Sequence, residues 1–166
     1  MNKALILSLF SLIMMSPTVE AQDRPGRERE RGGPQLDAGL KKNEEGALNG
    51  YTFFAPIRSK TTYLIDMKGE VVHEWPSEHP PGNSAYLMQD GSIVRTAQDF
   101  DNPIFHGGGS GGRIQHISWD GELLWDFLFS NEEHMQHHDI AVLPNGNVLM
   151  IAWEFKTQEE AIAAGR

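Results

Sequence analysis

Three histidines and an aspartate within six residues form the densest group of reactive side chains in the sequence. They lie in the segment EEHMQHHDIAVLPNGN, as His134, His137, His138 and Asp139. A neutral imidazole acts as a nucleophile or a general acid–base group near neutral pH, and a neighbouring carboxylate can fix the tautomer of the ring. The pair His137 and His138 is therefore the candidate catalytic centre, with Asp139 as the residue that orients it.

Plainer interpretations of the histidine cluster stay open. The rings could be exposed beside the acidic pair Glu132 and Glu133, or one of them could cap a strand. His134 and His138 are four residues apart, but this spacing suits zinc mainly when it falls on a helix. No further zinc-binding motif surrounds them, so the sequence predicts neither a metal site nor a cofactor.

A glycine-rich loop, FHGGGSGGR at 105–113, is the second candidate for chemistry. Its glycines let backbone N–H groups approach an anion, and the guanidinium of Arg113 suits the oxygens of sulfate or phosphate. The loop lacks the Lys-Ser/Thr ending of a phosphate-binding loop and no helix follows, so a nucleotide site is not predicted. A flexible connection between hairpins, with Arg113 in a structural ion pair, is the alternative.

Four β-hairpins are expected to position these residues. Each combines two short apolar runs with a polar residue and a glycine, the pair that tight turns favour. The predicted hairpins span 61–75, 84–97, 112–127 and 138–153, with turns at Gly69, Gly91, Gly121 and Gly146. After the last hairpin, Thr157 and Glu160 have the spacing of a capping box and predict a short helix.

The hairpins alternate between two kinds at a nearly constant spacing. Gly69 and Gly121 turn similar hairpins 52 residues apart, and Gly91 and Gly146 turn the other kind 55 residues apart. A four-stranded unit repeated about every 50 residues is typical of a β-propeller blade. We therefore predict an all-β fold of propeller type, with a sandwich of unrelated hairpins as the alternative. His137 and His138 would lie just before an innermost strand, at the mouth of the central channel.

The chain divides into three predicted parts. Residues 1–21 have the cationic start, the apolar run and the small-x-small ending of a signal peptide that is cut after Ala21. Their apolar run is too short to span a membrane, so we expect a periplasmic or secreted protein. Residues 22–48 are charged and poor in large apolar residues, which predicts a disordered linker, and residues 49–166 form the blades.

Composition excludes several classes of partner and chemistry. The formal net charge is −9, which argues against a nucleic-acid partner because phosphates are neutralised by a basic surface. The sequence has no cysteine, so disulfides, thiolate metal sites and a cysteine nucleophile are excluded.

From about Gly50 to Arg166 the chain resembles the bacterial arylsulfotransferase family, in its branch of exported six-bladed β-propellers. The most specific segment is HHDIAVLPNGNVLMIAWE at 137–154, and GGRIQHISWDGELLWDF and TYLIDMKGEVVHEWP add to the similarity. The resemblance implies transfer of a sulfuryl group from a phenolic sulfate ester to a phenol acceptor. It also implies a sulfated histidine intermediate and no nucleotide donor.

Under this resemblance, His137 and His138 correspond to active-site residues, and His138 is favoured as the nucleophile because Asp139 follows it directly. Arg113 and His106 are the candidate substrate-binding residues. A ring of six such blades needs about 300 residues. The chain is therefore expected to be an N-terminal fragment with two to three blades, inactive alone. A non-catalytic propeller that binds a ligand or a protein is the alternative, and the sequence does not indicate the oligomeric state.

Overall fold

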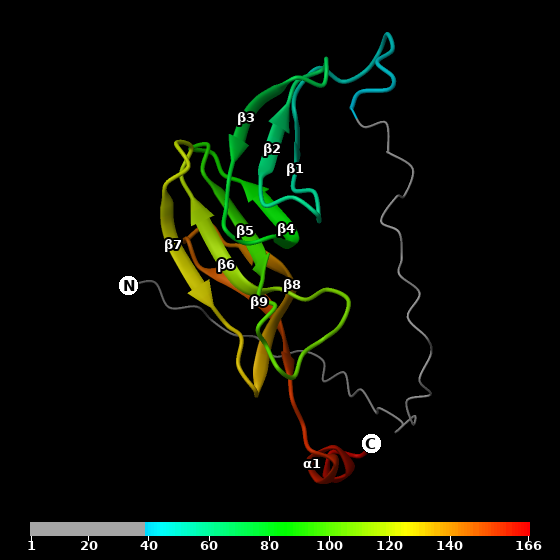
Figure 1. Cartoon of the computed structure of the whole chain (residues 1–166), viewed down its shortest axis with the longest axis vertical. Helices are drawn as coiled ribbons and strands as arrows, with labels where there is room; N and C mark the ends of the chain where they lie inside the picture. The colour runs from blue at the N-terminus through cyan, green and yellow to red at the C-terminus, as the bar shows by residue number, and fades with distance from the viewer. Residues whose placement is uncertain (1–38) are drawn as a thin grey trace, which may run out of the picture.

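The computed structural model describes residues 39–166 (Figure 1). The predicted signal peptide and most of the predicted linker lie outside the described residues. Residues 39–50 are exposed and contain neither strand nor helix. In the part of the chain that the structure describes, no helix is long and apolar enough to cross a membrane.

The strands form three antiparallel sheets, which confirms the prediction of an all-β fold. The first sheet contains β1 (Thr52–Phe54), β2 (Thr62–Ile65) and β3 (Val71–Trp75). The second contains β4 (Pro81–Leu87), β5 (Ile93–Gln98), β6 (Gly112–Ile117) and β7 (Leu123–Leu128). The third contains β8 (His134–Val142) and β9 (Val148–Glu154).

The four predicted hairpins are present as β2–β3, β4–β5, β6–β7 and β8–β9. Their turns need a residue with positive φ, the left-handed region that glycine enters without steric cost. The turn glycines adopt φ values between 79° and 83°, at Gly69, Gly91, Gly121 and Gly146. Turn chemistry therefore located all four hairpins correctly.

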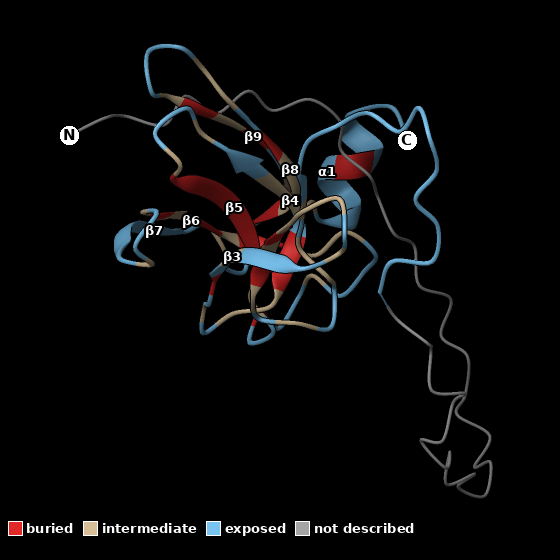
Figure 2. Cartoon of the chain, turned by 90° about the horizontal axis from the view of Figure 1, so that it is seen from above, coloured by how far each residue is buried: buried red, intermediate tan, exposed pale blue. Residues whose placement is uncertain are grey.

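The sheets stack face to face, with the second sheet in the middle. Successive side chains of a strand point to opposite faces, and β5 uses this alternation to fill two interfaces. Ile93 packs with Leu64 and Trp75 of the first sheet, whereas its neighbour Val94 belongs to the interface with the third sheet. Consequently β5 is the most buried strand, as its red ribbon shows in Figure 2.

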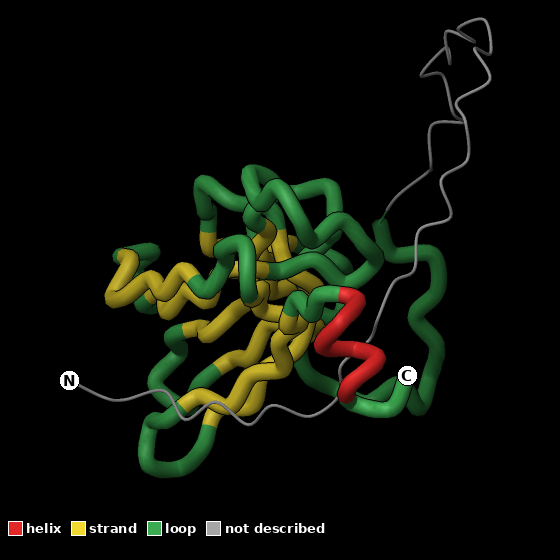
Figure 3. Tube along the Cα trace, turned by 90° about the horizontal axis from the view of Figure 1, so that it is seen from below, coloured by secondary structure: helices red, strands yellow, loops and turns green. Residues whose placement is uncertain are grey.

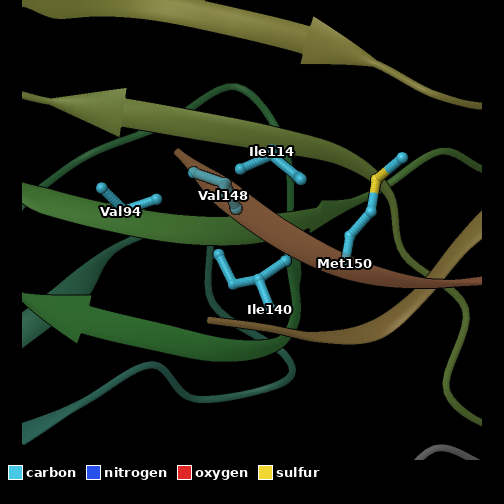
Figure 4. Packing of buried hydrophobic residues seen from close by; sticks show 5 residues of the cluster. All are labelled: Val94, Ile114, Ile140, Val148 and Met150. Carbon is cyan, nitrogen blue, oxygen red and sulfur yellow. The ribbon is translucent and has the colours of Figure 1, made fainter. Parts of the chain in front are cut away.

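The interface between the second and third sheets is a compact apolar cluster. Figure 4 shows its five buried side chains, Val94, Ile114, Ile140, Val148 and Met150. Complete burial of one such aliphatic side chain stabilises the fold by about 1.5–3 kcal/mol. This cluster fixes β8 against the second sheet, and β8 carries the candidate catalytic residues.

A short helix, α1 (Gln158–Ala163), follows β9 and lies beyond the end of the sheets in Figure 1; Figure 3 shows it from below, in red. The predicted capping box is present. The Thr157 side chain accepts a hydrogen bond from the Glu160 backbone N–H at 3.2 Å, and the Glu160 carboxylate accepts one from the Thr157 N–H at 2.9 Å. These two bonds satisfy backbone groups that a helix start leaves without partners.

Candidate functional site

The structure places the histidine cluster inside β8, whereas the sequence predicted a cluster just before the strand and a hairpin that begins only at residue 138. β8 begins at His134, which pairs with Glu154 at the end of β9. The prediction was wrong because the polar segment HMQHH has no apolar alternation, although its backbone continues the ladder with β9. The ring of His134 lies about 4 Å from the carboxylates of Glu133 and Glu154, at 4.0 and 3.9 Å.

A bulge in β8 separates His138 and Asp139 from β9. His137 pairs with Ile151, but the next pair in the ladder is Ile140 with Met150, so two residues of β8 have no partner on β9. Bulges interrupt the alternation of side chains and re-aim them, and they are common beside active sites. Here the bulge lets two consecutive imidazoles meet, with 2.6 Å between Nδ1 of His137 and Nδ1 of His138.

The backbone groups that the bulge removes from the ladder have other partners. The N–H of His138 donates to the Gly109 carbonyl at 2.8 Å, and the His138 carbonyl accepts from the hydroxyl of Thr96 at 3.1 Å. The His137 carbonyl accepts from the side-chain amide of Gln136 at 2.8 Å. A buried backbone group without a hydrogen-bond partner costs free energy of folding, so these hydrogen bonds stabilise the bulge.

The glycine-rich loop lies against the histidine pair, so the fold brings the two candidate segments together. Gly109 has a φ of 85°, and a Cβ at this position would lie only 2.6 Å from Nε2 of His137. Ser110 forms an isolated bridge with His137. The loop therefore covers the His137 ring, and this close approach requires glycine at position 109.

Burial lowers the pKa of His137 below its usual value of 6.5. The neighbouring charge of His138 lowers this pKa further, and a hydrogen bond to the Gly108 backbone partly offsets both effects. Removing an imidazolium from water disfavours the charged form, which explains the direction. His137 is therefore neutral at neutral pH.

The contact between the two Nδ1 atoms needs one donor and one acceptor, so the tautomers of the two rings are coupled. Nε2 is the nitrogen of His137 that this contact leaves available, it faces the glycine-rich loop, and a proton on Nε2 suits the carbonyl groups of that loop. Nδ1 of a neutral His137 is then an acceptor, and Nδ1 of His138 is the donor between the rings. In this tautomer of a neutral pair, Nε2 of His138 carries the free lone pair that a nucleophile requires.

Aromatic rings support the pair from the side of β9 and the loop. The ring centroid of Trp153 lies 4.4 Å from that of His137, and Phe105 stacks on Trp153 at 5.9 Å with an interplanar angle of 11°. Contacts of this kind add stability beyond the area they bury. The His137 ring is therefore held between the indole, the loop and His138.

Asp139 contacts a tyrosine of the second sheet. Its Oδ1 accepts a hydrogen bond from the hydroxyl of Tyr86 at 2.9 Å and another from the N–H of Ile140 at 2.8 Å. The bond to Asp139 raises the pKa of Tyr86. The His138 ring contacts His137, whereas Asp139 links the bulge to β4.

The two predicted substrate-binding residues are placed differently. The Arg113 guanidinium forms an ion pair with Asp126, the structural alternative considered for it. On β6 the neighbouring Ile114 faces the third sheet, so Arg113 lies on the face turned towards the first sheet, away from β8. His106 donates from Nε2 to the Pro103 carbonyl at 3.1 Å, within its own loop.

Three residues of this site were not identified from the sequence as functional candidates: Tyr86, Thr96 and Gln136. Their roles depend on contacts across sheets and on the bulge, for which the sequence carries no local signal.

Within residues 39–166, no group of three or more histidine, cysteine, aspartate or glutamate side chains is arranged to hold a metal ion. Comparisons of the chain with protein-family models, curated proteins and solved structures each found no match.

Proposed function

We propose that the chain belongs to an exported, arylsulfotransferase-like enzyme that transfers a sulfuryl group from a phenolic sulfate ester to a phenol. The observation that carries the proposal is the contact between His137 and His138, which leaves Nε2 of His138 free. The rings of Phe105 and Trp153 add an aromatic wall beside the pair, and the glycine-rich loop packs against His137. These are features that an aryl sulfate would use.

The proposed reaction has two transfers. In the first, Nε2 of His138 attacks the sulfur of the donor, an N–S bond forms, the S–O bond to the phenol breaks, and a phenolate leaves. In the second, the oxygen of the acceptor phenol attacks the same sulfur and the N–S bond breaks, while the phenol proton passes to the departed phenolate or to solvent. Such a covalent intermediate divides one difficult step into two easier ones.

His137 has a specific part in this scheme. Formation of the N–S bond makes the His138 ring cationic, and the charge is carried partly by the proton on Nδ1. His137 accepts that proton in a hydrogen bond at 2.6 Å, so it orients the ring and stabilises the developing charge. Gly109 lies against the Nε2 edge of His137.

We also propose that the three stacked sheets are neighbouring blades of a six-bladed β-propeller. Supporting this, the second sheet is a four-stranded antiparallel unit, and the first strand of the third sheet, β8, packs against β4, the first strand of the second. In such a propeller, β8 would place the histidine pair at the end of the blade that faces the central channel. The proposed export rests on residues 1–21, which lie outside the described residues.

A non-catalytic propeller that binds a protein is the second candidate, and the surface of β7 favours it. All six residues of β7 are exposed, and five of them are large and apolar: Leu123, Leu124, Trp125, Phe127 and Leu128. Exposed apolar patches of this kind mark interaction surfaces.

The proposal is tested with the protein at its full natural length, with 4-nitrophenyl sulfate as donor and a phenol as acceptor. We expect turnover, loss of it in His138→Ala, and a strong reduction in His137→Ala. His73→Ala is the matched control, because His73 lies on β3 and stacks on Trp119. Wild-type rates in both site variants would refute the catalytic role of the pair, and a protein without turnover would favour the binding module.

A further inference from the structure

Gln136 is a polar residue with no exposed surface, and it directly precedes the histidine pair on β8. Burying a side-chain amide is unfavourable unless its donors and acceptor find partners. The partners of this amide come from two separate segments: the bulge in β8 and the end of the glycine-rich loop.

The oxygen of the Gln136 amide holds the loop. Oε1 accepts a hydrogen bond from the backbone N–H of Gly112 at 3.0 Å, in a buried position. The preceding residue, Gly111, has no room for a side chain, because a Cβ there would lie 1.9 Å from Oε1 of Gln136. The end of the glycine-rich loop is therefore in direct contact with the Gln136 amide.

The nitrogen of the same amide holds the bulge. Nε2 donates to the carbonyl of His137 at 2.8 Å and, in a longer contact, to the carbonyl of Asp139 at 3.4 Å. These two carbonyls lie on either side of His138. One side chain thus connects the loop that covers the His137 ring with the backbone on both sides of the proposed nucleophile.

We infer that Gln136 is the positioning residue of this site, and that its amide holds the loop and the bulge in the arrangement that brings Nδ1 of His137 into contact with Nδ1 of His138. Its kinetic consequence rests on the proposed function, whereas its effect on the two rings does not. Without the amide, two carbonyls and one N–H lose their partners, so the bulge relaxes and the rings separate.

The direct test replaces the amide with an apolar side chain of similar length, in Gln136→Met. Selective 15N-histidine labelling of the full-length protein reports the tautomer of each ring, and the signals are assigned by their loss in His137→Asn and His138→Asn. We expect the wild type to show one fixed tautomer for each ring, and Gln136→Met to show both rings as averaged tautomers. Where turnover is measured, we expect kcat to fall about 100-fold with KM unchanged.

Two further variants separate positioning from general damage to the fold. Gln115→Met is the matched control, because Gln115 is also buried, with 3% of its surface exposed, and bonds to Ser77 on the other face of the second sheet. We expect it to leave the histidine signals unchanged. Gly111→Ala displaces the Gln136 amide without removing it and is expected to reproduce the spectra of Gln136→Met.

The inference is overturned if Gln136→Met and Gly111→Ala both keep the wild-type histidine spectra, or if Gln115→Met alters them equally. If the wild-type protein transfers no sulfuryl group, the proposed function fails, and the 15N spectra still decide the role of Gln136. Should Gln136→Met not fold, the spectra of Gly111→Ala decide it.

Discussion

Replacing Gly109 with alanine tests whether the glycine-rich loop and the His137 ring form one site. The added Cβ would lie 2.6 Å from Nε2, 3.0 Å from Cε1 and 3.2 Å from Cδ2 of His137. The ring cannot simply swing away, because Trp153 and His138 hold it on other sides. The loop or the ring must therefore move.

The size of the effect follows from two separate costs. Ordinary van der Waals contact begins at 3.4 Å, so the atoms must separate by about 0.8 Å. A misplacement of about 1 Å in an active site lowers the rate by up to about 100-fold. In addition, an L-residue at a φ of 85° costs about 1–2 kcal/mol of stability, whatever the surrounding space.

A second glycine separates these two costs. Gly121, in the β6–β7 turn, has a φ of 83°, but a Cβ there would meet nothing within 4 Å. Gly121→Ala therefore carries the backbone cost alone. Denaturant unfolding should show a loss of about 1–2 kcal/mol in Gly121→Ala and a loss at least as large in Gly109→Ala. Turnover of 4-nitrophenyl sulfate by the full-length protein should fall about 100-fold in Gly109→Ala only.

Two results would refute this reasoning. Full activity in Gly109→Ala would show that the loop can move without disturbing the ring, so the loop would not be part of the site. Equal losses of activity in both variants would show that the backbone cost alone explains the effect.

Three further predictions concern stability. Burial lowers the pKa of His137 in the folded protein below its value of 6.5 in the unfolded chain, so the unfolded chain binds more protons between these two pKa values. The contribution of His137 to stability should therefore be greatest above about pH 6.5 and should fall as the pH drops towards the folded pKa. In urea unfolding, His137→Gln should flatten this dependence on pH. Ile114→Ala should cost about 2–5 kcal/mol by denaturant unfolding, because Ile114 is 2% exposed between two sheets; a loss below 1 kcal/mol would contradict that packing. Thr157→Ala should reduce hydrogen-exchange protection in α1 and leave the thermal midpoint of the sheets unchanged, whereas a lowered midpoint would mean that α1 stabilises them.

The hairpins were predictable because their signals are local. A glycine at positive φ between two apolar runs specifies a turn wherever it falls, and the capping box of α1 is encoded within four residues. The start of β8 was missed for the same reason: HMQHH carries no apolar alternation, and only the length of β9 shows that the ladder continues to His134.

The site was predictable in its parts but not in its assembly. Sequence reasoning singled out the histidine pair and the glycine-rich loop, yet their contact depends on a bulge that needs the register of β8 against β9. The same bulge turns Asp139 towards Tyr86, a residue 53 positions away. The chemistry of Arg113 suited an anion, but the alternation of β6 places it on the opposite face.

The central claim is that Nε2 of His138 carries the sulfuryl group between donor and acceptor. Rapid quenching of the full-length protein with 4-nitrophenyl sulfate, followed by peptide mass spectrometry under mildly alkaline conditions, tests it most directly. We expect one SO3 group on the peptide that contains His138, its disappearance when a phenol is added, and no label in His138→Ala. Turnover that proceeds with no label on His138, or with the label on another residue, would contradict the claim.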